Sequence, residues 1–494
     1  MPLLSASIPK KTNPFAPRRY GEVQKITDAV YIFRNITNSS FVIGERAVAV
    51  IDTQVNPSSA GALLKAVRSV TTKPIRYVIN THYHWDHSNG NQIFKNEGAE
   101  IISSVLTREF MVKRHDRQKE FLSSRGFELS NDPLLPEITF QGEHFLDLGN
   151  RPLRLFFAGR AETDDATAVY VEKENILMSG DTVMTGSFPI FGQPVWDEGL
   201  QGDNQWIETI GKLMSLKPAH VVPGHGPLAH GSEVDLLVRI EEYFLKEVGT
   251  LVRKGAGLER VLAELEPRLP DWITTIPIVW GTPRYAILRV FRGLTKKEGD
   301  AEPGWQRFKP SAIPRGAGER VARAVRGKES FNEFLKMASE AKEGGDGALV
   351  LAILKKTTEL FPNLPDAWTA YAEALVDESR SVPSVLEKGD FFEPAKKCWD
   401  RALGLEANHV GALLGKGRYW TMMAYRGGDD PGPGMKLLEK VVELKPGGRA
   451  EAEAEFYIGV GYRRLHDEEK ARRQFQKAIQ LDSTFMPAHL ASQS

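Results

Sequence analysis

The stretch Thr81–His87, with the sequence THYHWDH, constrains the 494-residue chain more than any other feature. It follows an apolar run that predicts a buried strand, so its histidines lie on the loop that leaves the strand. Side chains alternate along an extended chain, and His82 and His84 therefore point the same way, toward one ion. Asp86 and His87 follow the next bend and can face a second ion. Imidazole and carboxylate are ligands that suit Zn²⁺, so the stretch predicts a metal-binding loop.

The alternative for this stretch is the polar start of a helix that carries unrelated histidines. Three of the eleven histidines of the chain fall within these seven residues, which argues against chance.

The pattern of residues divides the chain into four regions. Residues 1–20 are rich in proline and basic residues and predict an N-terminal arm. Residues 21–235 alternate strands with helices, an α/β pattern that places candidate catalytic residues on loops at strand ends. Helical periodicity then dominates, first in a helical extension and linker at 236–325 and then in a helical domain at 326–494.

Hydrophobic periodicity and turn residues give the expected elements of the α/β region. We expect short strands between 23 and 52, further strands at 76–80, 99–103, 138–140, 153–157, 167–171, 176–179 and 221–223, and helices at 60–70, 107–122 and 204–215.

Three segments of the helical domain, beginning at Ala395, Gly434 and Ala471, align without gaps. Each has a small residue, an apolar residue four positions later and a small or β-branched residue three positions after that. This pattern is similar to the second helix of a tetratricopeptide repeat. Such repeats can form a peptide-binding groove; alternatively, the helices pack on a neighbouring part of the chain or on a second subunit.

The composition bounds the partners and the location of the protein. The 64 basic residues balance the 64 acidic ones, which gives no electrostatic footprint for nucleic acid or an anionic membrane. No apolar stretch reaches the length needed to span a bilayer, and the N-terminus does not resemble a secretory signal. We therefore expect a cytoplasmic protein. In such a protein the sequons that begin at Asn35 and Asn38 do not carry glycans, because glycosylation requires secretion. The single cysteine, Cys398, excludes an internal disulfide framework.

Three later places in the chain can complete a two-metal site. They are the segment Ala158–Asp164, which contains Glu162, the turn Ser179–Asp181 and the turn Pro223–Gly226, which contains His225. Each follows a predicted strand, and the glycines permit tight turns that present a ligand. Asp181 is placed to bridge two cations.

The motifs HYHWDH, SGD and PGHG, preceded by Val-Ile-Asp52-Thr, resemble the metallo-β-lactamase superfamily over roughly residues 20–232. The resemblance implies an αβ/βα sandwich with a pair of zinc ions at one edge. It also implies a role for each residue: His82, His84 and a third ligand would hold one ion, Asp86, His87 and His225 would hold the other, Asp181 would bridge them, and Asp52 would orient the histidine loop.

Glu162 stands where the superfamily usually has the third histidine ligand of the first ion, and carboxylate oxygen also binds zinc. The alkylsulfatase branch carries a glutamate at this place. The stretch Trp280–Gly293, followed by Gly304-Trp305, is similar to the helical dimerisation region of alkylsulfatases, which implies a homodimer through the helical C-terminal region. The chain departs from that branch in having Asp181 as the bridging residue and in lacking the arginine-containing stretch that follows it.

The expected function is that of a dinuclear zinc hydrolase that uses a metal-bridging hydroxide oriented by Asp86. Sulfate esters of alkyl alcohols are the favoured substrates; the alternatives are a β-lactam, a lactone or a thioester. An interaction protein with a zinc-binding scaffold is the alternative of another class. Arg160, Tyr83 and His230 are candidate donors to the developing negative charge. The segment Phe188–Trp196 either lines a substrate mouth or seals the sandwich.

Overall fold

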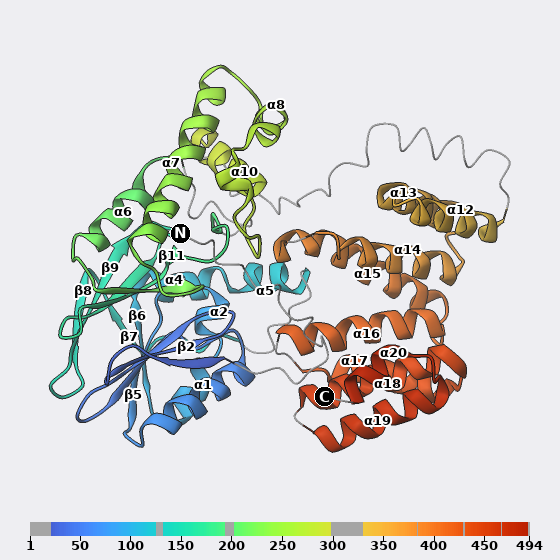
Figure 1. Ribbon diagram of the computed structural model, residues 1–494, viewed down its shortest axis with the longest axis horizontal. Helices are drawn as coiled ribbons and strands as arrows, with labels where there is room; N and C mark the ends of the chain where they lie inside the picture. Colours follow the sequence, from blue (N-terminus) through green and yellow to red (C-terminus); the bar gives the residue numbers. More distant parts are fainter. Residues whose placement is uncertain are drawn as a thin grey trace, which may run out of the picture. The chain divides into compact units, whose positions relative to one another are not determined.

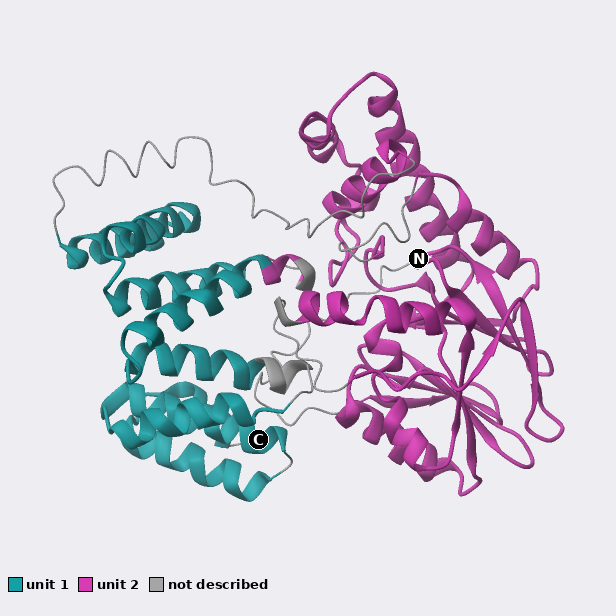
Figure 2. Ribbon diagram, turned by 180° about the vertical axis from the view of Figure 1, so that it is seen from behind, with its two compact units in different colours: residues 1–19, 309–381, 390–494 teal, residues 20–308, 382–389 magenta. Residues whose placement is uncertain are grey.

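The computed structural model describes residues 21–124, 132–192, 202–297, 330–382, 384–427, 430–465 and 467–492. The predicted arm at 1–20, most of the linker with Gly304-Trp305, and the end of Phe188–Trp196 lie outside these residues. The described residues form two compact units (Figure 2): a sheet unit within residues 20–308 and 382–389, and a helical unit within residues 309–381 and 390–494.

The sheet unit contains two sheets. The first has seven strands in the order β1(Glu22–Lys25), β2(Val30–Arg34), β3(Ser39–Ile43), β4(Val48–Ile51), β5(Ile75–Ile79), β6(Glu100–Ser104) and β7(Ile138–Phe140). The second has five strands in the order β12(His220–His225), β11(Ile176–Met184), β10(Ala166–Val171), β9(Pro152–Gly159) and β8(Glu143–Asp147). The pairs β4–β5, β5–β6, β6–β7 and β11–β12 are parallel, and the other pairs, including β3–β4, are antiparallel.

The main core of this unit lies between the sheets, where Ile51, Ile79 and Ile102 of the first sheet meet Leu155 and Val169 of the second. Helices cover both outer faces (Figure 1). The first sheet is covered by α1(Pro57–Val70), α3(Asn91–Asn96) and α4(Val105–Lys113), and the second by α6(Gln205–Met214) and α7(Gly231–Arg253). The unit also contains α2(Trp85–Ser88), α5(His115–Ser124), α8(Leu258–Leu265), the 3₁₀ turn η1(Glu266–Arg268), α9(Asp271–Thr274) and α10(Pro283–Thr295).

The helices of the outer layers are amphipathic and pack their apolar faces against the sheets. Helix α1 begins at a Pro, is capped by the Asn56 side chain, and buries Leu63 and Val67 against the first sheet. Helix α6 buries Trp206 and Leu213, and its neighbours in the fold are β9 and β11 of the second sheet. The resulting αβ/βα order of layers confirms the predicted fold class.

The helical unit contains α12(Phe331–Glu343), α13(Gly347–Leu360), α14(Pro365–Glu378), α16(Val410–Gly427), α17(Gly432–Leu444), α18(Gly448–Arg464), α19(Glu468–Leu481), α20(Met486–Ser492) and most of α15(Val385–Leu405). Small and aromatic residues of the predicted repeats form its cores: Ala471 and Phe475 pack with Phe456, and Leu438 packs with Ile458. The predicted all-helical region is confirmed, whereas its assignment to tetratricopeptide repeats stays a prediction.

The segment 382–389 interrupts the helical unit in sequence and belongs to the sheet unit. Within the sheet unit, the Ser384 hydroxyl donates to the carbonyl of Trp280 at 2.6 Å, and the Thr282 hydroxyl donates to Glu387 at 3.2 Å. The first turn of α15 is therefore anchored beside the start of α10.

Four local predictions were wrong or incomplete. The helix expected at 107–122 is two helices that break at Arg114, whose guanidinium lies 3.9 Å from the centroid of the Phe110 ring. Strand β8 and helix α3 were not predicted, because their charged and polar residues obscure the periodicity. Asp86 and His87 lie on the single-turn helix α2 rather than on a loop.

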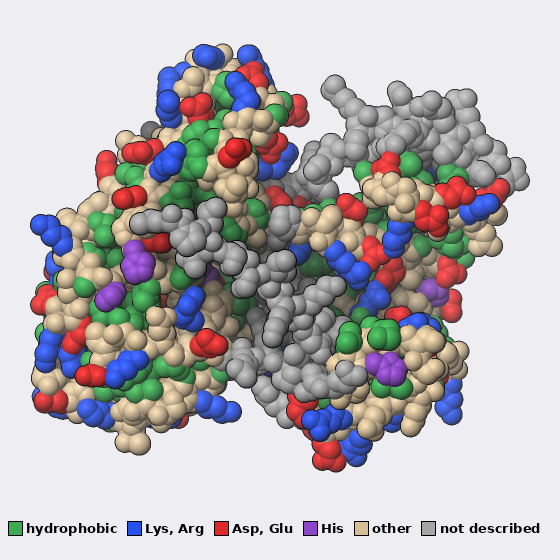
Figure 3. Space-filling model, viewed as in Figure 1, with side chains coloured by type: hydrophobic (Ala, Val, Ile, Leu, Met, Phe, Trp, Pro, Cys, Tyr) green, Lys and Arg blue, Asp and Glu red, His purple; other side chains and the backbone are tan. Residues whose placement is uncertain are grey.

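Among the described residues, no helix combines the length and apolar character needed to cross a membrane. On the face shown in Figure 3, basic and acidic side chains alternate over the described surface, as the balanced composition predicts.

Candidate metal centre

The first sheet supplies the histidine loop. Strands β4 and β5 are parallel neighbours, so their carboxyl ends meet at one edge of the sheet. Asp52 follows β4, and the segment Thr81–His87 follows β5. His82 and His84 lie on the connecting loop, and Asp86 and His87 lie one turn later on α2. All four side chains come from this one edge.

The second sheet supplies Glu162, Asp181 and His225. Glu162 follows β9, and His225 is the last residue of β12. Asp181 was expected on a turn after a strand, but β11 continues through it to Met184. The pairing of β11 with β12 shifts register around Gly180, which has a φ of +51°. This irregularity re-aims the chain, because a bulge turns a side chain out of its regular alternation.

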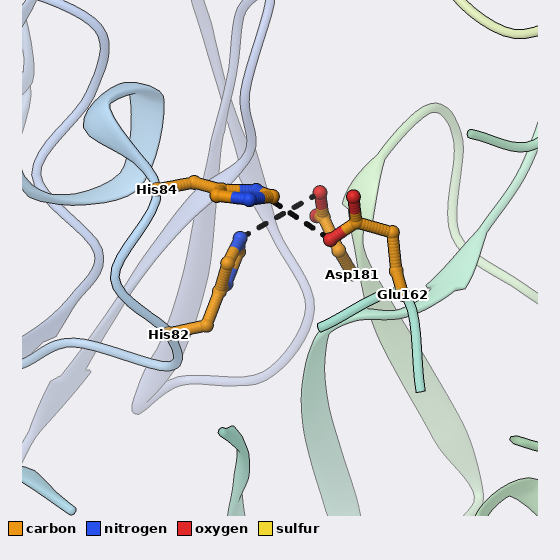
Figure 4. Close-up of side chains that lie close together, drawn as sticks. All are labelled: His82, His84, Glu162 and Asp181. Carbon is orange, nitrogen blue, oxygen red and sulfur yellow. Dashed lines mark ion pairs between the residues drawn. The ribbon is translucent and has the colours of Figure 1, made fainter. Parts of the chain in front are cut away.

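The structure brings the seven predicted residues together in two groups whose potential ligand atoms lie within 4.8 Å of one another. The first group is His82, His84, Glu162 and Asp181, whose side chains point toward a common centre in Figure 4. His84 Nδ1 lies 3.5 Å from Glu162 Oε2, and His82 Nε2 lies 3.8 Å from Asp181 Oδ2. The position of Glu162 in this group is the place that the sequence predicts for a third ligand.

The second group is Asp86, His87 and His225. His225 Nε2 lies 3.3 Å from Asp86 Oδ2, and His87 Nε2 lies 3.5 Å from the same oxygen. Asp181 reaches this group as well, with Oδ1 at 3.2 Å from His87 Nε2 and Oδ2 at 3.3 Å from His225 Nε2. Asp181 thus lies between the two groups, where a bridging ligand would have to be.

The electrostatics of the buried cluster fit cations. Burial lowers the pKa of His82 well below its ordinary value and His87 lowers it further, so His82 offers a lone pair. Burial opposes a charge on His225, but Asp181 and Asp86 outweigh it and raise the pKa of His225 to about 10. Burial likewise opposes ionisation of Asp181, yet His225 and His87 hold its pKa well below the ordinary range. The proton on His225 balances buried carboxylates, and a metal ion in its place would do the same.

The donor set also fits a metal. His82 Nε2 is buried and has no hydrogen-bond partner in the described parts of the chain. A buried polar atom of this kind requires a partner, and a cation supplies one. A cluster of imidazole nitrogens and carboxylate oxygens is typical of a zinc site. The individual ligand roles stay predictions.

Asp52 orients the histidine loop as the resemblance implies. Its carboxylate accepts from the backbone N–H and the hydroxyl of Thr81, each at 2.8 Å, and lies 2.8 Å from His87 Nδ1. With Nδ1–H donating to Asp52, His87 keeps Nε2 for the second group. Asp52 has a φ of +60°, so the loop geometry is held in a left-handed conformation that Asp tolerates.

Sequence reasoning missed two groups that contact these residues. The carboxylate of Asp165 accepts the backbone N–H of Tyr83 at 2.9 Å, between the two first-group histidines. The Thr37 hydroxyl donates to Asp86 Oδ2 at 2.9 Å. The segment singled out from the sequence ends at Asp164, one residue before Asp165, and the turn that contains Thr37 carried no signal of this contact.

The three candidate donors are placed differently from the expectation. The guanidinium of Arg160 pairs with Asp164 at 2.8 Å and with Asp203 at 3.8 Å. Tyr83 is buried, with its ring packed on Phe110. His230 is the exposed residue before α7. Of the three, Tyr83 does touch the first group, because its ring centroid lies 4.7 Å from that of His84.

The apolar segment after β11 seals the fold in its described part. Phe188 and Phe191 are buried, and their rings lie 5.9 and 6.0 Å from that of Phe244 on α7. Phe191 also packs on Trp206 of α6. The alternative that these aromatics close the sandwich is therefore correct for them, whereas Trp196 lies outside the described residues.

Gly224 leaves the space that Asp181 occupies. A Cβ atom built on Gly224 would lie 1.8 Å from Asp181 Oδ1. We expect Gly224→Ala to displace the Asp181 carboxylate and to lower the metal content of purified protein. Gly231→Ala, where an added Cβ meets nothing within 4 Å, is the matched control and should keep the wild-type content, measured by atomic absorption. Equal metal content in both variants would contradict this role of Gly224.

Residues 32–225 match the family model of the metallo-beta-lactamase superfamily, and this chain therefore carries a domain of that superfamily. The matched range contains all seven residues of the two groups.

The chain is similar in sequence to two curated relatives and similar in fold to a solved structure. The 2,4-dinitroanisole O-demethylase subunit alpha of Nocardioides sp. (strain JS1661) is 29% identical over 209 residues, which are 42% of this chain and 55% of that protein. The linear primary-alkylsulfatase of Pseudomonas sp. (strain ATCC 19151) is 20% identical over 340 residues, which are 60% of this chain and 62% of that protein. This chain covers less than two thirds of the length of either relative.

The stereoselective inverting sec-alkylsulfatase Pisa1 from Pseudomonas sp. is similar in structure, with a TM-score of 0.56 at 15% sequence identity. The match covers 78% of this chain and 66% of that chain, which includes helical residues after the sandwich. At this identity the likeness is one of fold. The predicted resemblance to the alkylsulfatase-like branch is thereby confirmed.

Proposed function

We propose that the protein is a dinuclear zinc hydrolase. One observation carries the proposal: imidazole and carboxylate groups from the edges of both sheets converge in a group of four and a group of three, with Asp181 between them. Two zinc ions bound by these residues would lower the pKa of a water molecule and polarise the bond to be cleaved.

The residues of the chain divide the remaining work. His82, His84 and Glu162 would hold the first ion, Asp86, His87 and His225 the second, and Asp181 both. Burial opposes ionisation of Asp86, but His87 and His225 together outweigh it and hold the pKa of Asp86 well below its ordinary value. Asp86 is therefore an anionic acceptor at neutral pH, which suits the proposed role of orienting the attacking water.

The proposed substrates are sulfate esters of alkyl alcohols. Glu162 in the first group, the alkylsulfatase relative and the fold shared with Pisa1 support this choice. A β-lactam, a lactone and a thioester are the alternatives within the superfamily. A second candidate is an aryl ether, because a relative with 29% identity is named as a demethylase of 2,4-dinitroanisole. Arg160 is engaged by two carboxylates, so it does not offer a free cation to a sulfate group.

Metal analysis and a substrate panel test the proposal. Purified protein should hold two zinc ions per chain and should hydrolyse a medium-chain alkyl sulfate faster than a β-lactam, a lactone, glutathione thioester or 2,4-dinitroanisole. Less than about one zinc per chain, with no activity restored by added zinc, would refute the hydrolase. Turnover of another panel member without turnover of the alkyl sulfate would refute the substrate alone.

Glu162→Ala tests the first group separately. We expect the variant to bind one of the two ions more than about a hundredfold more weakly, because it removes an anionic ligand oxygen. This loss of affinity exceeds the one that follows when a residue that only hydrogen-bonds to a metal ligand is removed. Glu162→His should restore binding through the usual superfamily ligand. Glu172→Ala, at an exposed position, is the control. Zinc affinities come from competition with a chromophoric chelator, and unchanged affinity in Glu162→Ala would remove Glu162 from the ligand set.

A homodimer formed through the helical C-terminal region and a cytoplasmic location complete the proposal. Both follow from the resemblance and the composition. Sedimentation velocity tests the dimer: a single species with the mass of one 55.1 kDa chain at micromolar concentration would refute it.

A further inference from the structure

The turn Asn35–Asn38 between β2 and β3, which we call the strap, contacts the second group at several points. It contains the first sequon and begins the second, motifs for which the sequence offered no role. In the structure, three consecutive strap residues each bind a different part of the surroundings of Asp86 and His225.

Ile36 fixes the orientation of His225. Its carbonyl lies 2.7 Å from His225 Nδ1, which therefore carries the proton and donates it. His225 Nε2 is then the nitrogen that faces Asp86 and Asp181, each at 3.3 Å. A hydrogen bond of this kind at the far nitrogen sets the direction in which a metal-ligating imidazole presents its lone pair.

Thr37 fixes Asp86. The residue is fully buried, and its hydroxyl donates to Asp86 Oδ2 at 2.9 Å. The same oxygen faces both His225 and His87. The hydroxyl therefore holds the carboxylate in the rotamer that completes the second group, and within the described residues its hydrogen bond goes to Asp86 rather than to a residue of the first group.

Asn38 fixes the turn that carries His225. Its backbone N–H donates to the Gly224 carbonyl at 2.8 Å, and its amide donates to the carbonyls of Pro223 at 2.9 Å and Gly226 at 2.8 Å. Asn38 thus holds the chain on both sides of His225. The buried amide has a structural use that is incompatible with a glycan.

Gln54 supports the strap from behind. Its amide donates to the Thr37 carbonyl at 2.8 Å, and its carbonyl oxygen accepts from Asn35 at 3.0 Å. Gln54 has a φ of +75° and lies two residues after Asp52, which holds His87. The short turn 52–54 therefore contacts His87 directly through Asp52. Through Gln54 it supports the strap, which in turn contacts Asp86 and His225.

We infer that the strap sets the affinity of the second metal ion independently of the first, with Thr37 and Asn38 as positioning residues. This inference rests on the proposed two-metal site. The first group is built from the loop after β5, from the segment after β9 and from β11. Among the described residues, the hydrogen bonds of the strap go to Asp86, to His225 and the turn around it, and to Gln54, and none goes to a residue of the first group.

Thr37→Val tests the inference, because it replaces the hydroxyl with a methyl group of similar size. We expect affinity for the ion of the second group to fall by about 10–100-fold, the range for an outer partner of a metal ligand, while affinity for the ion of the first group is unchanged. Thr37→Ser keeps the hydroxyl and should bind as the wild type does. Thr72→Val makes the same substitution at an exposed position and is the matched control.

Stepwise titration with Zn²⁺ and Co²⁺ gives both affinities, and the Co²⁺ absorption bands report each site without any assay of activity. Unchanged constants in Thr37→Val, or an equal fall in both constants, would overturn the inference. Thr37→Ala serves the same test should the valine variant not fold. A wild-type protein that binds fewer than two ions would instead refute the proposed function, so the two failures are distinguishable.

Discussion

Replacement of Asp181 with asparagine is expected to deplete both metal sites. Asp181 Oδ1 and Oδ2 face His87 and His225, and Oδ2 also faces His82 from the first group. The amide removes the negative charge and leaves one acceptor oxygen for two ions. We expect each ion to bind more than about a hundredfold more weakly, a larger loss than removal of an outer partner causes. Metal content after dialysis against a chelator measures the effect.

Asp147→Asn is the matched control, since Asp147 is an exposed residue of β8 on the same sheet. It should keep two ions. Circular dichroism must show that the Asp181 variant retains its secondary structure. Loss of one ion with wild-type affinity for the other would contradict a bridging role and assign Asp181 to a single site.

Replacement of Glu241 with methionine is expected to stabilise the protein at neutral pH. Glu241 lies on α7, is fully buried, and has no hydrogen-bond partner for either oxygen in the described residues. Burial raises the pKa of Glu241 well above its ordinary value. A buried polar group without a partner costs about 1–3 kcal/mol, which an apolar side chain of similar length would recover.

The sign of the pH dependence follows from the raised pKa of Glu241. The folded protein binds the proton more tightly than the unfolded chain does, so this contribution to stability is complete below the unfolded pKa. It is lost as pH rises toward the folded pKa, and the stabilisation by methionine should therefore grow from acidic to neutral pH. Urea unfolding at several pH values, followed by fluorescence, measures it. Glu242→Met replaces the exposed neighbour and should change the free energy of unfolding little. If the stabilisation by Glu241→Met did not depend on pH, the raised pKa of Glu241 would be contradicted.

The convergence of the residues of the two groups could be predicted from sequence because each stands in a local pattern. The histidine loop follows an apolar strand, and Asp181 and His225 stand beside glycines. The continuation of β11 through Asp181 could not be foreseen, since glycine before a polar residue usually ends a strand. Here Gly180 instead permits a left-handed conformation inside the strand.

The supporting contacts could not be predicted, because they join residues that are distant in sequence. Thr37 and Asp86 are 49 residues apart, and Tyr83 and Asp165 are 82 residues apart. Neither Thr37 nor Asp165 has a local pattern that distinguishes it from a turn residue or a helix cap. Such partners become visible only in the fold: Thr37 meets Asp86 at the edge of the first sheet, and Asp165, which precedes β10 of the second sheet, meets Tyr83, which follows β5 of the first.

The segment 382–389 has a consequence for synthesis on the ribosome. These residues belong to the sheet unit, yet they emerge after α12, α13 and α14 of the helical unit. The bonds from Ser384 to Trp280 and from Thr282 to Glu387 therefore form only when about ninety further residues have followed α10. The two units cannot be completed one after the other, and a nascent chain that stops before residue 382 leaves the start of α10 without these partners.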